Sequence, residues 1–154
     1  MRRNDREIKD KTIIESIINE ALVCRIGLSE NNIPYIIPMN FGYRDNYLFL
    51  HSAKEGRKID MIRNNNNVCF EIDISHEIIK SQKACDWGMN FRSIVGFGKA
   101  FLLDDITEKR NALDIIMRKY SGMNLSFEYP GNAIDQIAII KIEIKSITGK
   151  KCGY

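Results

Sequence analysis

The hydrophobic residues of this chain follow two different spacings, and these spacings predict its secondary structure. Ile13, Ile17 and Ile18 recur at helical intervals, which predicts an amphipathic helix capped by Asp10 or Thr12. Further along, apolar and polar residues alternate, as they do in half-buried strands. Strands are predicted over 22–28, 33–43, 47–53, 68–74, 90–105 and 136–150, and further helices over 54–67 and 105–120.

Prolines and glycines mark where these strands bend or lie at an edge. Pro34 and Pro38 interrupt the second strand. Because proline has no N–H to donate to a neighbouring strand, this strand is predicted to lie at a sheet edge or to carry a bulge. Gly96 and Gly98 interrupt the long fifth strand. Glycines inside a strand indicate a bend or the close approach of a ligand or of backbone.

The order of the elements favours a small antiparallel barrel. The chain contains short hairpins, such as the turn at 44–46, and no regular strand–helix–strand repeat, so a doubly wound parallel sheet is not expected. Residues 75–88 give no clear pattern, and 124–135 are predicted to form a long loop. We therefore expect one domain over 1–154, in which a few helices flank the barrel.

Composition and charge exclude several classes of protein. The chain has 154 residues, of which 44% are hydrophobic and 28% charged, as in a globular domain and unlike a disordered or collagen-like chain. Lys and Arg number 23 against 20 Asp and Glu, and this net charge of +3 does not favour nucleic acid as a partner. No apolar stretch is long enough to span a membrane.

The cysteines and the N-terminus predict a cytoplasmic protein. The four cysteines are widely spaced without a metal-binding pattern, and Cys24, Cys69 and Cys85 lie in or beside apolar runs, which predicts buried free thiols. The first residues are charged throughout and do not resemble a signal peptide. Free thiols without an export signal are typical of a reducing compartment.

Candidate catalytic residues are few, which favours chemistry supplied by an organic cofactor. The chain has no G-x-S-x-G motif, no Ser-His-Asp order and no Walker loop. Its two histidines are His51, at the end of an apolar strand, and His76, in a polar segment. If the protein is an enzyme, we expect it to bind and orient a cofactor that carries the reaction.

The most informative segment passes from a strand into a basic helix start. Ser52 ends the strand, and Arg57 and Lys58 stand side by side where the helix is predicted to begin. A phosphate placed there would meet a hydroxyl, backbone N–H groups and two cations that can neutralise a dianion. A solvated helix face is the alternative interpretation of the same charges.

Two further segments could contact a flat ring. Arg92 and Ser93 open the strand that Gly96 and Gly98 interrupt, and these glycines would let a ring lie against the backbone. A bent barrel strand is the alternative explanation for the glycines. In the earlier segment around Gly42, the broken ladder would leave backbone donors and acceptors free to bind the polar edge of a ring.

Taken in order, these segments resemble the flavin-binding split-barrel superfamily related to pyridoxamine 5′-phosphate oxidase, and within it the Nim group of 5-nitroimidazole resistance proteins. The matching stretches cover most of the chain: CRIGL (24–28), PYIIPMNFGY (34–43), YLFLHSAKEGRKID (47–60), VCFEID (68–73), CDWGMNFRSIVGFGKA (85–100) and ITGKKCGY (147–154).

The resemblance implies an α+β fold, a mainly antiparallel six-stranded split β-barrel with Greek-key topology and flanking helices, which binds FMN at a homodimer interface. The phosphate-binding pair of the family falls on Arg57 and Lys58. His51 matches a histidine that is functional in some Nim-type proteins, which makes it the candidate catalytic residue. The residues implied to contact the cofactor are Pro38, Asn40, Phe41, Gly42, Tyr43, His51, Ser52, Ala53, Arg57, Lys58, Arg92, Ser93, Val95 and Lys150.

The function implied is that of an FMN-dependent oxidoreductase. A reduced nicotinamide or another donor would reduce the flavin, and a small electron-poor aromatic such as a 5-nitroimidazole would accept the electrons. The segment ending at Gly153 and Tyr154 has no counterpart of the substrate-binding Arg and His of pyridoxamine phosphate oxidases, so that oxidase activity is not expected. A non-catalytic flavin- or haem-binding split-barrel protein is the alternative.

Overall fold

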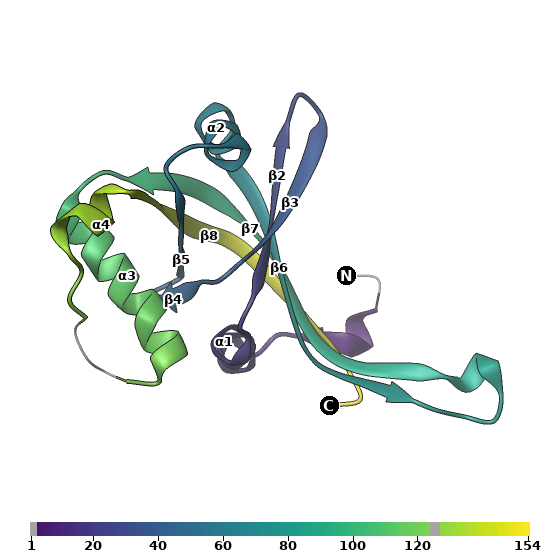
Figure 1. Cartoon of the computed structure of the whole chain (residues 1–154). Coiled ribbons are helices and arrows are strands. Elements are labelled where there is room, and N and C mark those ends of the chain that lie inside the picture. Colours follow the sequence, from purple (N-terminus) through teal and green to yellow (C-terminus); the bar gives the residue numbers. More distant parts are fainter. Residues whose placement is uncertain (1–2, 124–126) are drawn as a thin grey trace.

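The structure, a computed structural model, describes residues 3–123 and 127–154, and its strands form one antiparallel sheet (Figure 1). The elements in chain order are η1 (Asn4–Arg6), β1 (Glu7–Ile8), α1 (Lys11–Glu20), β2 (Cys24–Glu30), β3 (Ile33–Met39), β4 (Gly42–Arg44), β5 (Tyr47–Ala53), α2 (Arg57–Asn64), β6 (Asn67–Ile79), η2 (Ala84–Asp86), β7 (Gly88–Leu103), α3 (Ile106–Ser121), α4 (Gly131–Asp135) and β8 (Ile137–Cys152).

The order of strands in the sheet explains why it forms a barrel. The order is β3-β2-β6-β7-β8-β5-β4, and β1 pairs separately with β8. The two end strands, β3 and β4, are consecutive in the chain, and only Asn40 and Phe41 lie between them. The sheet must therefore curl until its ends approach each other. The predicted α+β split barrel with flanking helices is confirmed, although the sheet has eight strands instead of six.

The helices cover different parts of the barrel (Figure 1). Helix α2 lies over one end, near the β2–β3 hairpin, and α1 lies at the opposite end. Helix α3 packs beside β4 and β5. The far halves of β6 and β7 leave the body as a long two-stranded arm, which includes the segment 75–88 that gave no clear pattern. None of the helices in residues 3–123 and 127–154 is long and apolar enough to cross a membrane.

The core consists of the inward-facing side chains of the strands. Leu48, Leu50, Phe70, Ile72 and Ile94 are all almost fully buried inside the barrel. A second, smaller cluster forms where α3 and α4 pack against the outside of β5 and β8, and its members are Phe49, Ala112, Leu113, Ile116, Ile134 and Ile139. This second cluster covers the outer surface of β5 up to the position of His51, which stays exposed.

Two aspartates begin the longer helices, as the sequence predicts. The Asp10 side chain accepts a hydrogen bond from the N–H of Thr12 at 2.8 Å, and Asp105 accepts one from the N–H of Glu108 at 2.9 Å. Asp10 and Asp105 are therefore the N-caps of α1 and α3.

The prolines lie in an edge strand of the barrel, and the glycines allow close packing within it. Strand β3, which contains both prolines, lies at the edge of the sheet as predicted. Gly96 faces the core, where an added Cβ would lie 2.1 Å from the ring of Phe70, and a Cβ on Gly98 would lie 2.3 Å from the carbonyl oxygen of Glu143. The prediction that these glycines leave room for a flat ligand ring is wrong. Their space is filled by the protein's own ring and backbone.

Other expectations also need correction. The predicted strand 33–43 is two strands, β3 and β4, because the chain turns at Asn40 and Phe41 to join the two sheet ends. The predicted loop 124–135 contains the short helix α4, while residues 124–126 lie outside the described residues. All four cysteines are free thiols, but only Cys24 is buried. Cys69 and Cys85 are exposed and Cys152 is half-buried. Apolar neighbours in the sequence therefore do not imply that a cysteine is buried.

Candidate functional site

The junction between β5 and α2 presents an open helix start. Gly56 is the N-cap of α2 with a φ of 111°, and it has no side chain to bond the first N–H groups. Its carbonyl oxygen accepts the N–H groups of Ile59 and Asp60. The N–H groups of Arg57 and Lys58 precede the first intrahelical partners. This end of α2 therefore offers backbone donors and a partial positive charge to an anion.

Two cations flank this helix start without an acidic partner. Among residues 3–123 and 127–154, neither Arg57 nor Lys58 forms an ion pair. The Arg57 guanidinium lies 4.7 Å from the centre of the Tyr35 ring on β3. Lys58 is half-buried over the end of the barrel, and this burial lowers the pKa of its amine. Two cations at one helix start, neither in an ion pair among the described residues, fit a phosphate dianion.

The strand before this junction presents His51 to solvent. His51 and Ala53 point outward from β5, whereas Ser52 points inward and is buried. The Ser52 hydroxyl donates to the carbonyl oxygen of Ala53 at 2.7 Å. His51 is therefore accessible to a bound ligand, and Ser52 shapes the chain that leads to the basic pair.

The connection between β3 and β4 is only partly available to a ligand. Pro38 and Asn40 are exposed on the outside. Phe41 is fully buried in the core, and an added Cβ on Gly42 would lie 2.8 Å from helix α3. The Tyr43 hydroxyl donates to a carboxylate oxygen of Glu15 on α1 at 3.3 Å. Phe41, Gly42 and Tyr43 thus pack this connection against the rest of the protein, and their cofactor contacts stay predictions.

A second group of predicted residues lies near the base of the arm. Ser93 on β7 pairs directly with Lys150 on β8. Arg92 points to the opposite face, where its guanidinium donates to Glu20 at 3.1 Å and to Ser75 at 2.7 Å. Arg92 therefore holds α1 against the base of the arm, and its contact with a cofactor stays a prediction.

The two groups of predicted residues lie far apart in one copy of the chain. His51 pairs with Ile139 and Ser93 pairs with Lys150, so eleven residues of β8 separate them. That is roughly 35 Å of strand path at about 3.3 Å per residue. This path is an upper limit on the separation of the two groups, because the pairing of β7 with β8 shifts its register between Phe97 and Gly98.

An exposed apolar row crosses the sheet between these two groups. Hydrogen-bonded pairing places Ile36, Gly27, Cys69, Phe97 and Ser146 side by side on five strands. The side chains of Ile36 and Phe97 are 67% and 57% exposed. Apolar side chains that gather on one exposed surface mark an interaction site. We call the surface formed by this row and its neighbours Arg25, Glu71 and Val95 the outer face.

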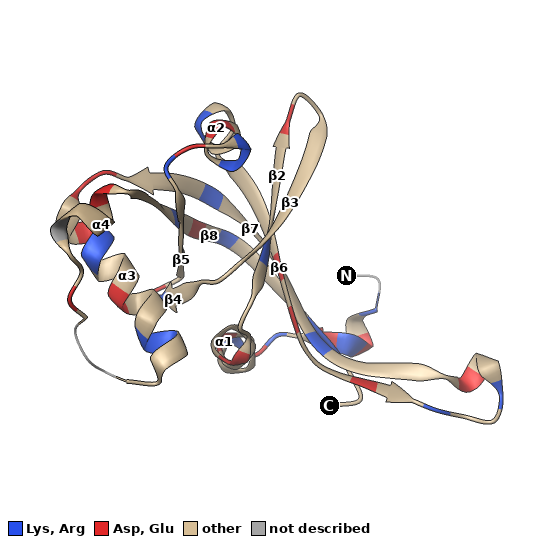
Figure 2. Ribbon diagram, viewed as in Figure 1, with Lys and Arg blue, Asp and Glu red and all other residues tan. Residues whose placement is uncertain are grey.

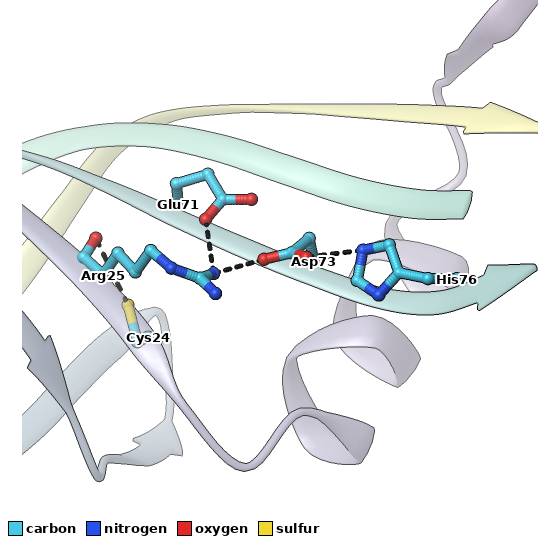
Figure 3. Close-up of polar contacts among 5 residues, drawn as sticks. All are labelled: Cys24, Arg25, Glu71, Asp73 and His76. Atoms are coloured by element: carbon cyan, nitrogen blue, oxygen red, sulfur yellow. Dashed lines mark hydrogen bonds and ion pairs between the residues drawn. The ribbon is translucent and has the colours of Figure 1, made fainter. Parts of the chain in front are cut away.

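An ion network lies on the outer face (Figure 3). The Arg25 guanidinium contacts a Glu71 oxygen at 3.0 Å and also pairs with Asp73. The His76 Nε2 lies 2.5 Å from the other Asp73 oxygen. Burial, followed by the charge of Asp73, raises the pKa of Glu71. No sequence motif predicted this network, because Arg25 meets the carboxylates only through the register of β2 and β6.

The arrangement of acidic and sulfur ligands does not suggest a metal. No group of three or more His, Cys, Asp or Glu side chains suitable for a metal ion occurs in the part of the chain that the structure describes. Figure 2 shows basic residues on α2 and around the base of the arm, that is, at both groups of predicted residues.

Comparison with known proteins identifies the family. The sequence pattern of the family "Pyridoxamine 5′-phosphate oxidase" matches residues 10–151. The chain therefore belongs to the pyridoxamine 5′-phosphate oxidase family, a family of flavin-binding split barrels. No curated protein matches the chain significantly.

Solved structures show which members this chain is similar to. A candidate 5-nitroimidazole antibiotic resistance protein from Bacteroides thetaiotaomicron VPI-5482 is 40% identical, with a TM-score of 0.84 over 94% of this chain and 86% of that one. A flavocytochrome from Azotobacter vinelandii is 17% identical, with a TM-score of 0.85 over 100% and 72% of the two chains. An FAD- and haem-binding protein from Mycobacterium smegmatis is 12% identical, with a TM-score of 0.85 over 97% and 74%. The last two share the fold alone.

Proposed function

We propose that this protein is a homodimeric FMN-dependent oxidoreductase that reduces small electron-poor aromatics such as 5-nitroimidazoles. The observation that carries the proposal is the pair Arg57 and Lys58 at the uncapped start of α2, which forms no ion pair within residues 3–123 and 127–154. Their charge and the open N–H groups suit the phosphate of FMN. The 40% identity to the Bacteroides protein supports the class of acceptor.

Each residue group has a distinct role in this proposal. Arg57 and Lys58 bind the phosphate, and the exposed Pro38 and Asn40 contact the ring or ribityl chain. Ser93 and Lys150 of a second copy complete the site across the outer face. A bound flavin would accept two electrons from a reduced nicotinamide or another donor and pass them to the acceptor. His51, exposed on β5, donates a proton to the acceptor as it is reduced.

The first test is the cofactor itself. We expect the purified protein to be yellow, to release FMN on denaturation, and to gain about 2.7 kcal/mol of stability when FMN is present at about 100 times its Kd. Absorption spectra, chromatography of the released ligand and thermal melts measure this. A colourless protein that FMN does not stabilise would contradict the proposal. A Soret band in place of flavin absorption would favour a haem-binding protein, and bound flavin that no donor reduces would favour a non-catalytic one.

A second test concerns His51. In His51→Ala we expect FMN affinity to change less than about threefold and nitroimidazole reduction to slow by roughly 100-fold, at the lower end of what positioned general acids contribute. Stopped-flow oxidation of the reduced flavin by the acceptor measures this step. Arg110→Ala, which alters an exposed residue of α3, is the control and should keep the rate. Equal rates for His51→Ala and the unmodified protein would exclude His51 as the proton donor.

A further inference from the structure

The last turn of α3 binds two other segments through Lys119. The Lys119 Nζ donates to the carbonyl oxygens of Ile18 at 2.7 Å and Asn19 at 2.8 Å, at the end of α1. It also lies 4.5 Å from the centre of the Phe41 ring. Burial lowers the pKa of Lys119 to about 8, so the amine keeps most of its charge at neutral pH. This charge suits both the terminal carbonyl groups of a helix and an aromatic face.

The next residue, Tyr120, uses one hydroxyl for two backbone groups. Its oxygen accepts the N–H of Phe41 at 2.9 Å and donates to the carbonyl oxygen of Leu22 at 2.8 Å. Phe41 lies in the two-residue connection between β3 and β4, outside both strands. A backbone N–H in such a place needs a partner from elsewhere in the protein, and Tyr120 provides it.

These contacts fix the direction of Asn40. The ring of Phe41 is buried and contacts Lys119, and its N–H donates to Tyr120, so Phe41 faces the interior. Asn40, the residue before it, is exposed on the outside, where Pro38 also lies. The orientation of this proposed contact surface therefore depends on α3, because no ladder of strand pairs holds the connection itself.

We propose that Lys119 and Tyr120 are positioning residues for the flavin site, which hold the β3–β4 connection so that Asn40 faces the cofactor. This inference rests on the proposed function, since it assigns these residues to the same site. Neither residue touches the cofactor. They act through the backbone of Phe41, and the bound conformation of the connection is already present before the ligand arrives.

The chain offers a matched control for Tyr120. Tyr129 also donates its hydroxyl to one partner, Asp114 on α3, at 2.8 Å. Tyr129→Phe removes this hydroxyl and so deletes one hydrogen bond to α3. The deleted bond does not involve Phe41. Tyr120→Phe and Tyr129→Phe thus remove the same atom at two places, and only the first leaves the Phe41 N–H without its partner.

We expect Tyr120→Phe to bind FMN about tenfold more weakly, with an altered fluorescence of the bound flavin. Without FMN, amide hydrogen exchange should become faster at residues 40–41. Tyr129→Phe should lower the melting temperature but keep FMN affinity within about twofold and leave exchange at 40–41 unchanged. Lys119→Met should weaken FMN binding, and Lys119→Arg, which keeps the cation, should restore most of it.

The outcomes separate this inference from the proposed function. If the unmodified protein binds FMN and Tyr120→Phe binds it equally well, the positioning role is wrong and the function stands. If Tyr120→Phe and Tyr129→Phe weaken binding to the same extent, the loss comes from stability and the role is again wrong. If the unmodified protein binds no flavin, the proposed function fails and the inference fails with it.

Discussion

Replacing both cations at the start of α2 should weaken FMN binding by about 10²–10⁴, because each charge-assisted bond to phosphate contributes roughly 1.5–3 kcal/mol. The change is Arg57→Ala combined with Lys58→Ala. Neither side chain has an acidic partner in the described residues, so their removal leaves no carboxylate unpaired. Fluorescence titration of the apoprotein with FMN measures the affinity.

Riboflavin makes this experiment specific for the phosphate. Riboflavin lacks the phosphate, so the double variant and the unmodified protein should bind it with similar affinity. The difference between the FMN and riboflavin results then isolates the interaction of the pair with the dianion. Arg63→Ala is the control on the same helix, because Arg63 faces Asp60 at 3.8 Å in an exposed ion pair. An equal loss of FMN and riboflavin affinity would place the phosphate elsewhere.

The second large effect is expected on the outer face. Phe97→Glu should raise the dissociation constant of the dimer by about 10³ or more, because each buried carboxylate without a partner costs several kcal/mol. The ring of Phe97 is exposed in one copy and lies in the row that crosses five strands, between Cys69 and Ser146. Sedimentation velocity over a range of protein concentrations measures the dimer.

The same variant should lose FMN affinity in proportion to the monomer formed. This follows from the proposed site, in which Ser93 and Lys150 come from the second copy. Ile106→Glu, which changes an exposed residue at the start of α3, should remain dimeric and bind FMN normally. A monomeric Phe97→Glu protein that still binds FMN tightly would show that one copy holds a complete site.

Local patterns in the sequence predicted most of the helices and strands. The isoleucines of α1 repeat at helical spacing because one side of that helix packs on the barrel, and Ile17 and Ile18 are buried there. The alternation of 136–150 predicted β8 because the inner side of that strand is buried. The two prolines predicted an edge strand for the simple reason that they cannot donate to a second neighbour.

Features that depend on register or on distant packing could not be predicted in this way. The arm formed by β6 and β7 has Ile78 and Trp87 exposed, so no buried side produced an alternating pattern. The inward direction of Gly96 follows from the position of the Phe70 ring, which no local signal shows. The hydrogen bond between the Phe41 N–H and the Tyr120 hydroxyl joins residues 79 positions apart in sequence. Among the site residues, the basic pair was the easiest to find because adjacent cations at a helix start are a local feature.

Strand β8 has a consequence for how the protein is made. It pairs with β1, β5 and β7, and it is synthesised after all three. While the ribosome is still adding residues 137–152, β5 has no partner on the side that β8 will occupy. The strands β7 and β5, which β8 joins in the finished sheet, are not yet connected. Most pairings of the barrel join residues distant in sequence, which is typical of slow folding. The nascent chain therefore carries exposed strand edges until β8 emerges, and unpaired edges of this kind are prone to aggregation.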